Sequence, residues 1–185
     1  MQIETLELPD ILVIRPNVIT DERGYFVETF NKRAMPDAIA RVEFVQDNQS
    51  LSRRPFTIRG LHFQVGSSAQ AKLVRVLSGS ILDVVVDLRR GSPHFGRYAK
   101  TILTSAGFEQ LWVPIGFAHG FCALEADSVV LYKVTNFFDL EAERGIRWDD
   151  PELAIDWGVD DTKVTLSARD RQHPFLRDIP AIFDF

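Results

Sequence analysis

Cysteine is nearly absent from this chain, with Cys122 the only one among 185 residues. One cysteine cannot form a disulfide within the chain, so we expect a reducing compartment and place the protein in the cytoplasm. Long apolar runs are also missing, since none approaches the ~20 residues of a membrane-spanning helix. The first residues, 1–4, lack the charged and apolar regions of a signal peptide. We therefore expect no membrane partner.

An excess of basic residues is missing as well. The chain has 21 Lys and Arg against 26 Asp and Glu, a net charge of −5. This balance argues against a nucleic-acid partner, which would favour a clustered basic face. A small anionic ligand would need local cations against the overall sign, so Arg and Lys in apolar surroundings become the informative residues.

Helical periodicity is scarce. The best candidate helix covers residues 31–40, where Asn31 can cap the start and Pro36 limits the length. Elsewhere the pattern favours short strands separated by glycine, proline and serine. The expected strands are 11–15, 25–30, 42–48, 57–65, 72–77, 80–88, 98–104, 109–113, 119–125 and 128–138.

Many short strands at regular spacing predict an all-β sandwich or barrel. Neither a low-complexity linker nor a repeat divides the chain, so we expect one domain over residues 1–185. Its last segment, 149–185, is rich in Asp and Pro and is expected to wrap around the barrel with a few short turns.

Two of the four histidines, His62 and His119, lie inside apolar strand-like runs. Histidine has an unperturbed pKa near neutrality and is the natural proton-transfer group. A lone histidine in a strand is nevertheless more often structural than catalytic. The other two, His94 and His173, adjoin prolines and are expected at the surface.

Strand alternation suggests what surrounds these histidines. A two-residue turn at Ser78-Gly79 would pair the strand carrying Lys72 with the strand carrying Asp83 and place both on one face. Asp83 could then hold the Lys72 ammonium.

A second such turn, at Ala126-Asp127, would place Tyr132 diagonally beside His119. Convergence of His62, Lys72, Asp83, His119 and Tyr132 in one cavity would favour catalysis over packing.

A metal site is a competing interpretation. Residues 114–119 resemble the Pro-x-Gly-x-x-His signature of the cupin superfamily, whose partner motif brings a His-x-His pair and a Glu. Here the matching region has His62 alone, with Gln64 in place of the second histidine. Mononuclear sites in such barrels need three or four protein ligands, so we expect no metal.

Seven segments together resemble the dTDP-4-dehydrorhamnose 3,5-epimerase family, over about residues 5 to 178. No single motif decides it, but the ordered set is specific. The segments are Phe44–Asn48, Arg59–Gln64, Ala71–Val76, Leu111–Pro114, Gly116–Phe121, Leu131–Lys133 and Arg144–Trp148.

The resemblance implies a cupin-type jelly-roll β-barrel with a few short peripheral helices, a homodimer without cofactor or metal, and a dTDP-4-keto-6-deoxy sugar as substrate. His62 resembles the general base, Asp170 its paired carboxylate and Tyr132 the general acid, while Lys72 would lie beside the C4 carbonyl. The positions that match substrate-binding residues are Arg23, Glu28, Gln46, Asn48, Arg59, Lys72, His119, Phe138, Glu143 and Arg169.

The chain departs from the usual family residues at two of these positions. The family usually has lysine at Arg169, and it often has tyrosine at Phe138, which is implied to stack on the thymine. The chemistry agrees with the resemblance, because C3 and C5 both flank the C4 ketone. Removal of a hydrogen from either carbon gives an enolate that Lys72 can stabilise. Three alternatives stay open: an epimerase of one carbon only, a metal-dependent cupin enzyme, and a sugar-nucleotide sensor.

Overall fold

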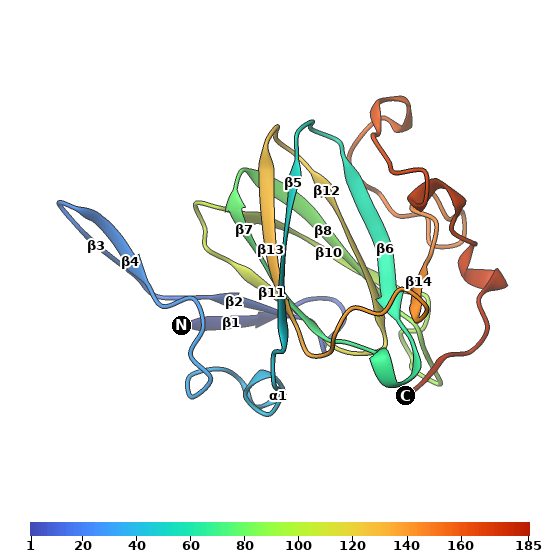
Figure 1. The fold of residues 1–185 in the computed structure, drawn as a ribbon, viewed down its shortest axis with the longest axis horizontal. Helices are drawn as coiled ribbons and strands as arrows, with labels where there is room; N and C mark the ends of the chain where they lie inside the picture. The colour runs from blue at the N-terminus through green and yellow to red at the C-terminus, as the bar shows by residue number, and fades with distance from the viewer.

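The computed structural model describes residues 1–185 and contains two large antiparallel sheets that face each other (Figure 1). The first sheet has six strands. In spatial order they are β1 (Gln2–Thr5), β2 (Leu12–Arg15), β11 (Gln110–Val113), β7 (Lys72–Ser78), β13 (Ser128–Val134) and β5 (Gln46–Ser52). The second sheet has five strands. They are β10 (Tyr98–Thr104), β8 (Ser80–Asp87), β12 (Phe117–Ala123), β6 (Ile58–Gln64) and β14 (Glu143–Gly145).

The main core lies between the two sheets. Alternate residues of facing strands enter it, as the period of two in a strand requires. Val74 and Val76 come from β7 in the first sheet, and Ile81 and Val85 come from β8 in the second. Because Lys72 and Asp83 share the parity of these residues, they also face the interior.

Strand β8 is buried along its whole length. Its second face, with Leu82, Val84 and Val86, packs against a separate apolar cluster that includes Trp157 and Leu176. Covering on both faces explains why this strand reads as an almost continuous apolar run. The cover is the C-terminal segment, which carries short 3₁₀ turns along the outside of the second sheet (Figure 1): η2 (Asp161–Lys163), η3 (Asp170–Gln172) and η4 (Leu176–Asp178).

A third apolar cluster covers the outer face of the first sheet. Leu73 and Trp112 pack there against Met35 and Ile39. Ile39 belongs to α1 (Asp37–Ala40), the only α-helix of the chain; the remaining short helix, η1 (Gly66–Ser68), is a 3₁₀ turn. None of these helices is long and apolar enough to span a bilayer.

Two small two-stranded sheets complete the fold. One, β9 (Arg89–Arg90) with β15 (Phe183–Asp184), ties the C-terminal end to the body. The other, β3 (Val18–Asp21) with β4 (Gly24–Val27), is a hairpin that projects away from the barrel (Figure 1). Its exposed faces carry large apolar side chains, including Ile19, Tyr25 and Phe26.

The predicted all-β class is confirmed, but both predicted hairpins are wrong. At Ser78-Gly79 the chain crosses from β7 in the first sheet to β8 in the second, and after Ala123 it crosses from β12 to β13 in the same way. A tight turn can join two strands that pair within one sheet or two strands that belong to different sheets. The sequence of the turn does not distinguish these two cases. The predicted helix over 31–40 is reduced to one turn that starts directly after Pro36.

Candidate active site

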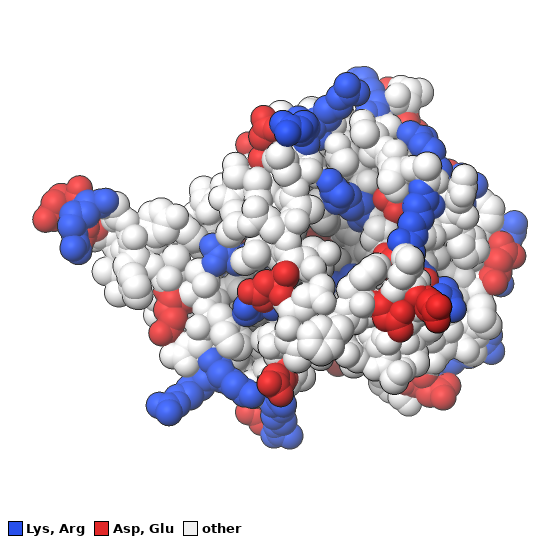
Figure 2. All heavy atoms as spheres, in the orientation of Figure 1, with Lys and Arg blue, Asp and Glu red and all other residues white.

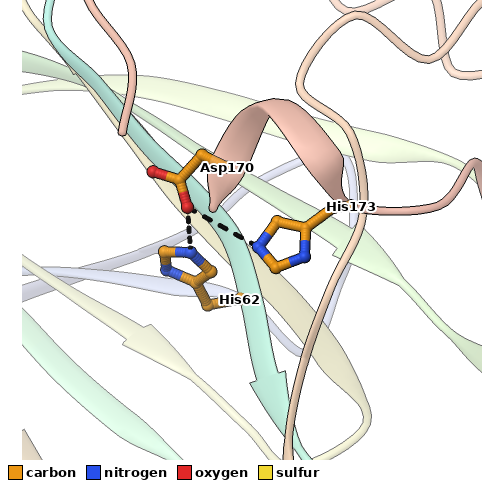
Figure 3. A group of neighbouring side chains, drawn as sticks. All are labelled: His62, Asp170 and His173. Atoms are coloured by element: carbon orange, nitrogen blue, oxygen red, sulfur yellow. Dashed lines mark hydrogen bonds and ion pairs between the residues drawn. The ribbon is translucent and has the colours of Figure 1, made fainter. Parts of the chain in front are cut away.

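Two histidine–aspartate pairs are close enough for hydrogen bonding, and the pair of His62 and Asp170 is the more exposed of them. His62 Nε2 lies 2.7 Å from Asp170 Oδ1 (Figure 3), and the two side chains are 28% and 6% exposed. Asp170 begins the 3₁₀ turn η3, where its backbone N–H donates to the hydroxyl of Ser167. Burial would raise the pKa of the Asp170 carboxyl, but the imidazoles of His173 and His62 hold it below its usual range. Asp170 is therefore an anion at neutral pH.

A bulge in β6 turns His62 toward the interior together with Arg59. His119 on β12 lies opposite His62, whereas Phe121 lies opposite Arg59, so two residues of β6 face the single Gly120. Without this extra residue, the strand period of two would send Arg59 and His62 to opposite faces. A side chain at Gly60 would meet the backbone of Gly120 at 2.6 Å, which explains glycine at the bulge.

Lys72 opens β7 and is buried within the same cavity. Its Nζ lies 3.3 Å from the backbone carbonyl oxygen of His62. Burial lowers the pKa of Lys72 to about 8, against the opposing charges of Asp83 and Glu143. The ammonium is thus retained at neutral pH, although it is much easier to deprotonate than an exposed lysine.

His119 and Asp83 form the second pair. His119 Nε2 lies 2.8 Å and 3.0 Å from the two carboxylate oxygens of Asp83, and both side chains are almost fully buried. Burial lowers the pKa of His119, with Asp83 opposing the shift. The prediction that Asp83 holds the Lys72 ammonium needs correction. Asp83 is hydrogen-bonded to His119 and acts on Lys72 through its charge.

Tyr132 lies on β13, in the sheet that faces His62. Burial raises the pKa of its hydroxyl, as does the charge of Glu143. The phenol therefore keeps its proton at neutral pH. Arg59 lies nearby in the same cavity, where its guanidinium donates to the hydroxyl of Ser52 and the backbone carbonyl of Leu51.

These residues line one cavity of ≈ 290 Å³. It opens between β5 and β6 as a hollow with basic side chains at its rim (Figure 2). Arg169 and Glu143 stand at this cavity as an ion pair at 2.5 Å. The predicted site residues that the structure brings together here are Arg59, His62, Lys72, His119, Tyr132, Glu143, Arg169 and Asp170.

Three predicted residues lie beside this group. Gln46 and Asn48 share one face of β5, joined by a hydrogen bond of 2.8 Å, and Asn48 is opposite Tyr132 across the ladder. Phe138 is half exposed on the loop after β13, and its backbone N–H donates to Gln46. The two remaining residues, Arg23 and Glu28, are elsewhere. Arg23 pairs with Asp21 at the exposed hairpin tip, and Glu28 accepts from Asn31.

The chain matches the family model described as dTDP-4-dehydrorhamnose 3,5-epimerase over residues 5–178. It is 47% identical to the dTDP-4-dehydrorhamnose 3,5-epimerase of Pseudomonas aeruginosa, over 96% of this chain and 97% of that protein. The chain belongs to the dTDP-4-dehydrorhamnose 3,5-epimerase family. The predicted family and the predicted isomerase class are thereby confirmed.

Solved structures of this family agree with the fold. The dTDP-6-deoxy-D-glucose-3,5-epimerase of Legionella pneumophila, in complex with dTDP-4-keto-L-rhamnose, is 38% identical, with a TM-score of 0.93 over 100% of this chain and 98% of that one. A 3'-monoepimerase of Streptomyces bikiniensis, in complex with dTDP-quinovose, is 29% identical, with a TM-score of 0.86 over 94% and 87%. The predicted cupin-like jelly roll is confirmed.

Sequence reasoning missed four residues at this epimerase-family site: Ser50, Phe121, Ser167 and His173. Ser50 presents a buried hydroxyl without a hydrogen-bond partner to the cavity. His173 was expected at the surface, and that prediction is wrong, because its side chain is 10% exposed and its Nε2 lies 3.5 Å from Asp170 Oδ1. A signal was present: residues three apart stack on one side of a 3₁₀ turn, so the spacing Asp170-x-x-His173 could have placed them together.

Proposed function

We propose that this protein epimerises C3 and C5 of dTDP-4-dehydro-6-deoxy-D-glucose to give dTDP-4-dehydro-L-rhamnose, in the synthesis of dTDP-L-rhamnose. The observation that carries the proposal is one cavity lined by the His62–Asp170 pair, the Lys72 ammonium and the Tyr132 phenol. This set supplies a base, an acid and a cation for an enolate, with no further group required.

His62 is the base in this proposal. With Nε2 hydrogen-bonded to the Asp170 carboxylate, the other ring nitrogen is left to accept a proton from carbon. The C–H electron pair then forms a double bond between that sugar carbon and C4. The electrons of the C4 carbonyl bond move onto its oxygen, which becomes an enolate oxygen. Asp170 fixes the tautomer of His62 and favours the imidazolium that forms. General acid–base steps of this kind contribute about 10²–10⁴-fold each.

Lys72 stabilises the enolate. A cation at the C4 oxygen interacts more strongly with the enolate than with the neutral ketone, so it lowers the barrier and not merely the energy of the bound substrate. Burial supports this role in two ways, because it keeps water away from the ammonium and brings the pKa of Lys72 down to about 8. An enolic oxygen can therefore share the lysine proton.

Tyr132 returns a proton from the other side. Inversion requires the new proton to arrive on the ring face opposite to the one that lost it. His62 belongs to β6 of the second sheet, whereas Tyr132 belongs to β13 of the first, so the two side chains enter the cavity from opposite walls. The raised pKa of Tyr132 favours a phenol that is protonated and ready to donate.

The nucleotide needs cations and a stacking surface. Arg59 and Arg169 are the two arginines that line the cavity and are proposed to bind the diphosphate, since guanidinium meets phosphate with two hydrogen bonds. Phe138 offers an exposed ring for the thymine, next to the amides of Gln46 and Asn48. His119 and Glu143 complete the proposed binding residues at the cavity wall.

A homodimer would explain the position of Arg23 and Glu28. Both lie on or beside the projecting hairpin, away from the cavity of their own chain (Figure 1). The hairpin exposes Tyr25 and Phe26, which are 65% and 67% accessible, a large apolar surface for a free element. We propose that the hairpin packs on a second copy and delivers Arg23 and Glu28 to the cavity of that copy.

Mixed dimers test this arrangement. Arg23→Ala and His62→Asn would each inactivate a homodimer, but a mixed dimer would contain one site with intact His62 and a partner with intact Arg23. Mixing the two inactive variants, with subunit exchange verified, should therefore restore part of the activity. A mixture that stays as inactive as its components would contradict the exchange of hairpins.

Counting solvent hydrogens tests the activity itself. The purified protein, given the dTDP-keto sugar in D₂O, should release a product labelled at both C3 and C5 with inverted configuration at each. A label at C3 alone would instead favour a second candidate function, epimerisation of one carbon only. The similarity to the 3'-monoepimerase supports this candidate. No label at either carbon would contradict both.

No cofactor or metal has a part in this mechanism. A metal-dependent cupin reaction remains the weaker alternative, and purification without chelator followed by metal analysis and assay separates the two. The cytoplasmic location inferred from the single cysteine stays a prediction.

A further inference from the structure

Three potential metal ligands lie close together, and one of them is the proposed base. His62, Asp170 and His173 each offer one ligand atom, and these atoms all lie within 4.8 Å of one another (Figure 3). The two imidazole rings meet edge to face, with their centroids 5.5 Å apart. This group differs from a site built on His62 and His119, because it contains Asp170 and His173 and does not include His119.

His173 is held firmly in this position. Its ring fills the space beside Gly145, where even a Cβ would meet Nε2 at 2.5 Å. Pro174 follows directly and fixes the chain after the 3₁₀ turn η3. The side chain is 10% exposed, so it cannot turn out to water without moving the backbone around it.

One atom of this group has only a distant partner. His173 Nε2 is buried, and it meets Asp170 Oδ1 in an ion-pair contact of 3.5 Å, which is longer than a normal hydrogen bond. A buried nitrogen that is left so weakly paired costs free energy and calls for an explanation. The nitrogen faces the same Oδ1 atom that His62 contacts (Figure 3).

We propose that His62 Nε2, Asp170 Oδ1 and His173 Nε2 bind Zn²⁺ or a similar divalent transition metal, and that this metal inhibits the enzyme. Two imidazoles and one carboxylate form a ligand set that zinc accepts, with a water in the fourth position. Zinc–ligand distances of about 2.0–2.2 Å require only that His173 Nε2 approach and that the hydrogen bond between His62 and Asp170 open slightly. Two other cations lie near this group: Arg169, which is paired with Glu143, and Lys72, whose Nζ lies 3.3 Å from the backbone carbonyl oxygen of His62.

Inhibition follows from the tautomer of His62. When Nε2 binds a metal, the neutral imidazole carries its only proton on Nδ1, and the ring has no basic nitrogen left for the substrate. Asp170 is at the same time withdrawn from its hydrogen bond with His62. The loss of rate rests on the proposed base role of His62, whereas the binding of the metal does not.

The metal can reach the site from two sides. His62 and Asp170 line the main cavity, and His173 lines a second cavity of ≈ 320 Å³ that shares Glu143 and Arg169 with the first. The nucleotide binds on the His62 side, so the ion need not displace it. We therefore expect zinc to lower the turnover rate while the affinity for dTDP is unchanged.

The test compares two histidine variants in metal-buffered solution. Zinc binding is measured by isothermal titration calorimetry, and turnover is followed at the same free zinc concentrations. The wild-type chain should bind one zinc and lose activity as it does so. Each variant is compared with its own zinc-free rate, and in His173→Ala the zinc concentration for half-inhibition should rise at least about 10–100-fold, the range seen when even an outer partner of a metal is removed.

His94→Ala is the matched control, because it removes an imidazole from a proline-containing turn outside the cluster. It should keep the zinc affinity and the inhibition of the wild type. His173→Gln covers the case in which the alanine variant folds poorly, since it retains bulk and polarity without an imidazole. Equal inhibition of the wild type and both His173 variants would overturn the proposal, as would an absence of stoichiometric binding.

The outcomes also separate this inference from the proposed function. If the chain has no epimerase activity, calorimetry still reports whether His173 contributes to a zinc site. If the epimerase activity is present and zinc binding is not, only the inference fails. Activation by zinc would contradict inhibition and would favour the metal-dependent alternative.

Discussion

The molecule contains the same chemical pair twice, in two different settings. His62 and Asp170 join a strand to a 3₁₀ turn 108 residues away, and His62 is 28% exposed toward the cavity. His119 and Asp83 lie on neighbouring strands of one sheet and are 6% and 0% exposed. Burial lowers the pKa of His119 and leaves it a neutral, fixed element of the wall.

The difference teaches that a histidine–aspartate pair is not by itself a catalytic unit. The first pair can accept a proton from a ligand because His62 presents an edge to the cavity. The second is enclosed, and its carboxylate instead supports the charge of Lys72. We therefore propose that the first pair transfers protons and that the second gives electrostatic support.

The largest effect is expected from Asp170→Asn. The amide would no longer fix the tautomer of His62 or favour its imidazolium, so kcat should fall about 10²–10⁴-fold. Affinity for dTDP, measured by calorimetry, should change little because Arg59, the proposed diphosphate ligand, is unchanged. A variant that retains most of its turnover would remove Asp170 from the mechanism.

Lys72→Met should lose activity and gain stability together. Loss of the cation at the enolate should lower kcat about 10²–10³-fold. Burial lowers the pKa of Lys72 from 10.5 to about 8. At about 1.4 kcal/mol per unit, the buried ammonium costs on the order of 3 kcal/mol below pH 8.

The pH dependence of the free energy of unfolding tests whether the buried ammonium is destabilising. The unfolded chain binds more protons than the native one between the two pKa values, so wild-type stability should rise with pH above about 8. Lys72→Met should abolish that rise and should have the higher free energy of unfolding at pH 7 in denaturant titrations. A less stable variant would mean that the ammonium is well solvated in the native state.

Arg59→Ala should affect binding and spare the chemistry, since Arg59 belongs to neither pair. Hydrogen bonds to charged groups are worth about 1.5–3 kcal/mol, so the Kd for dTDP should rise about 10–100-fold. Single-turnover rates at saturating substrate should stay near those of the wild type. A large loss of rate with unchanged affinity would assign Arg59 to catalysis.

Asp83→Asn makes the same substitution in the second pair and should have the smallest effect on the rate at neutral pH. The charge of Asp83 raises the pKa of Lys72, so its removal should lower that pKa below about 8. The alkaline limb of the kcat/KM profile should then move to lower pH, because the ammonium is lost earlier. Asp170→Asn should leave that limb in place, and an identical shift in both variants would contradict the division between the pairs.

Sequence alone predicted most of the strands, but not β1, β3, β9, β14 or β15, and it placed β5 at residues 42–48 where the strand is Gln46–Ser52. Alternation placed Lys72 and Asp83 in the interior correctly, even though the hairpin used to argue it does not exist. Pairing could not be predicted, because the turn at Ser78-Gly79 serves a crossing between sheets as readily as a hairpin. The bulge at Gly60 was also beyond reach, since it depends on the close approach of Gly120.

The site was predicted mainly through resemblance. Nothing local in the sequence joins His62 to Asp170, which lies far along the chain in a segment without strand or helix periodicity. The resemblance named both residues, and the structure puts them in contact. It also named Arg23, which lies at the exposed hairpin tip outside the cavity, a place that the proposed homodimer would explain. His173 was missed because proline beside it suggested an exposed turn.

Hydrogen exchange at the sugar carbons tests the division between the two pairs most directly. His62→Asn and His119→Asn are each incubated with the dTDP-keto sugar in D₂O, at saturating substrate, and deuterium at C3 and C5 is followed by NMR. We predict that the His62 variant incorporates none above background, while the His119 variant exchanges both positions. Exchange that persists without His62 and disappears without His119 would contradict the account.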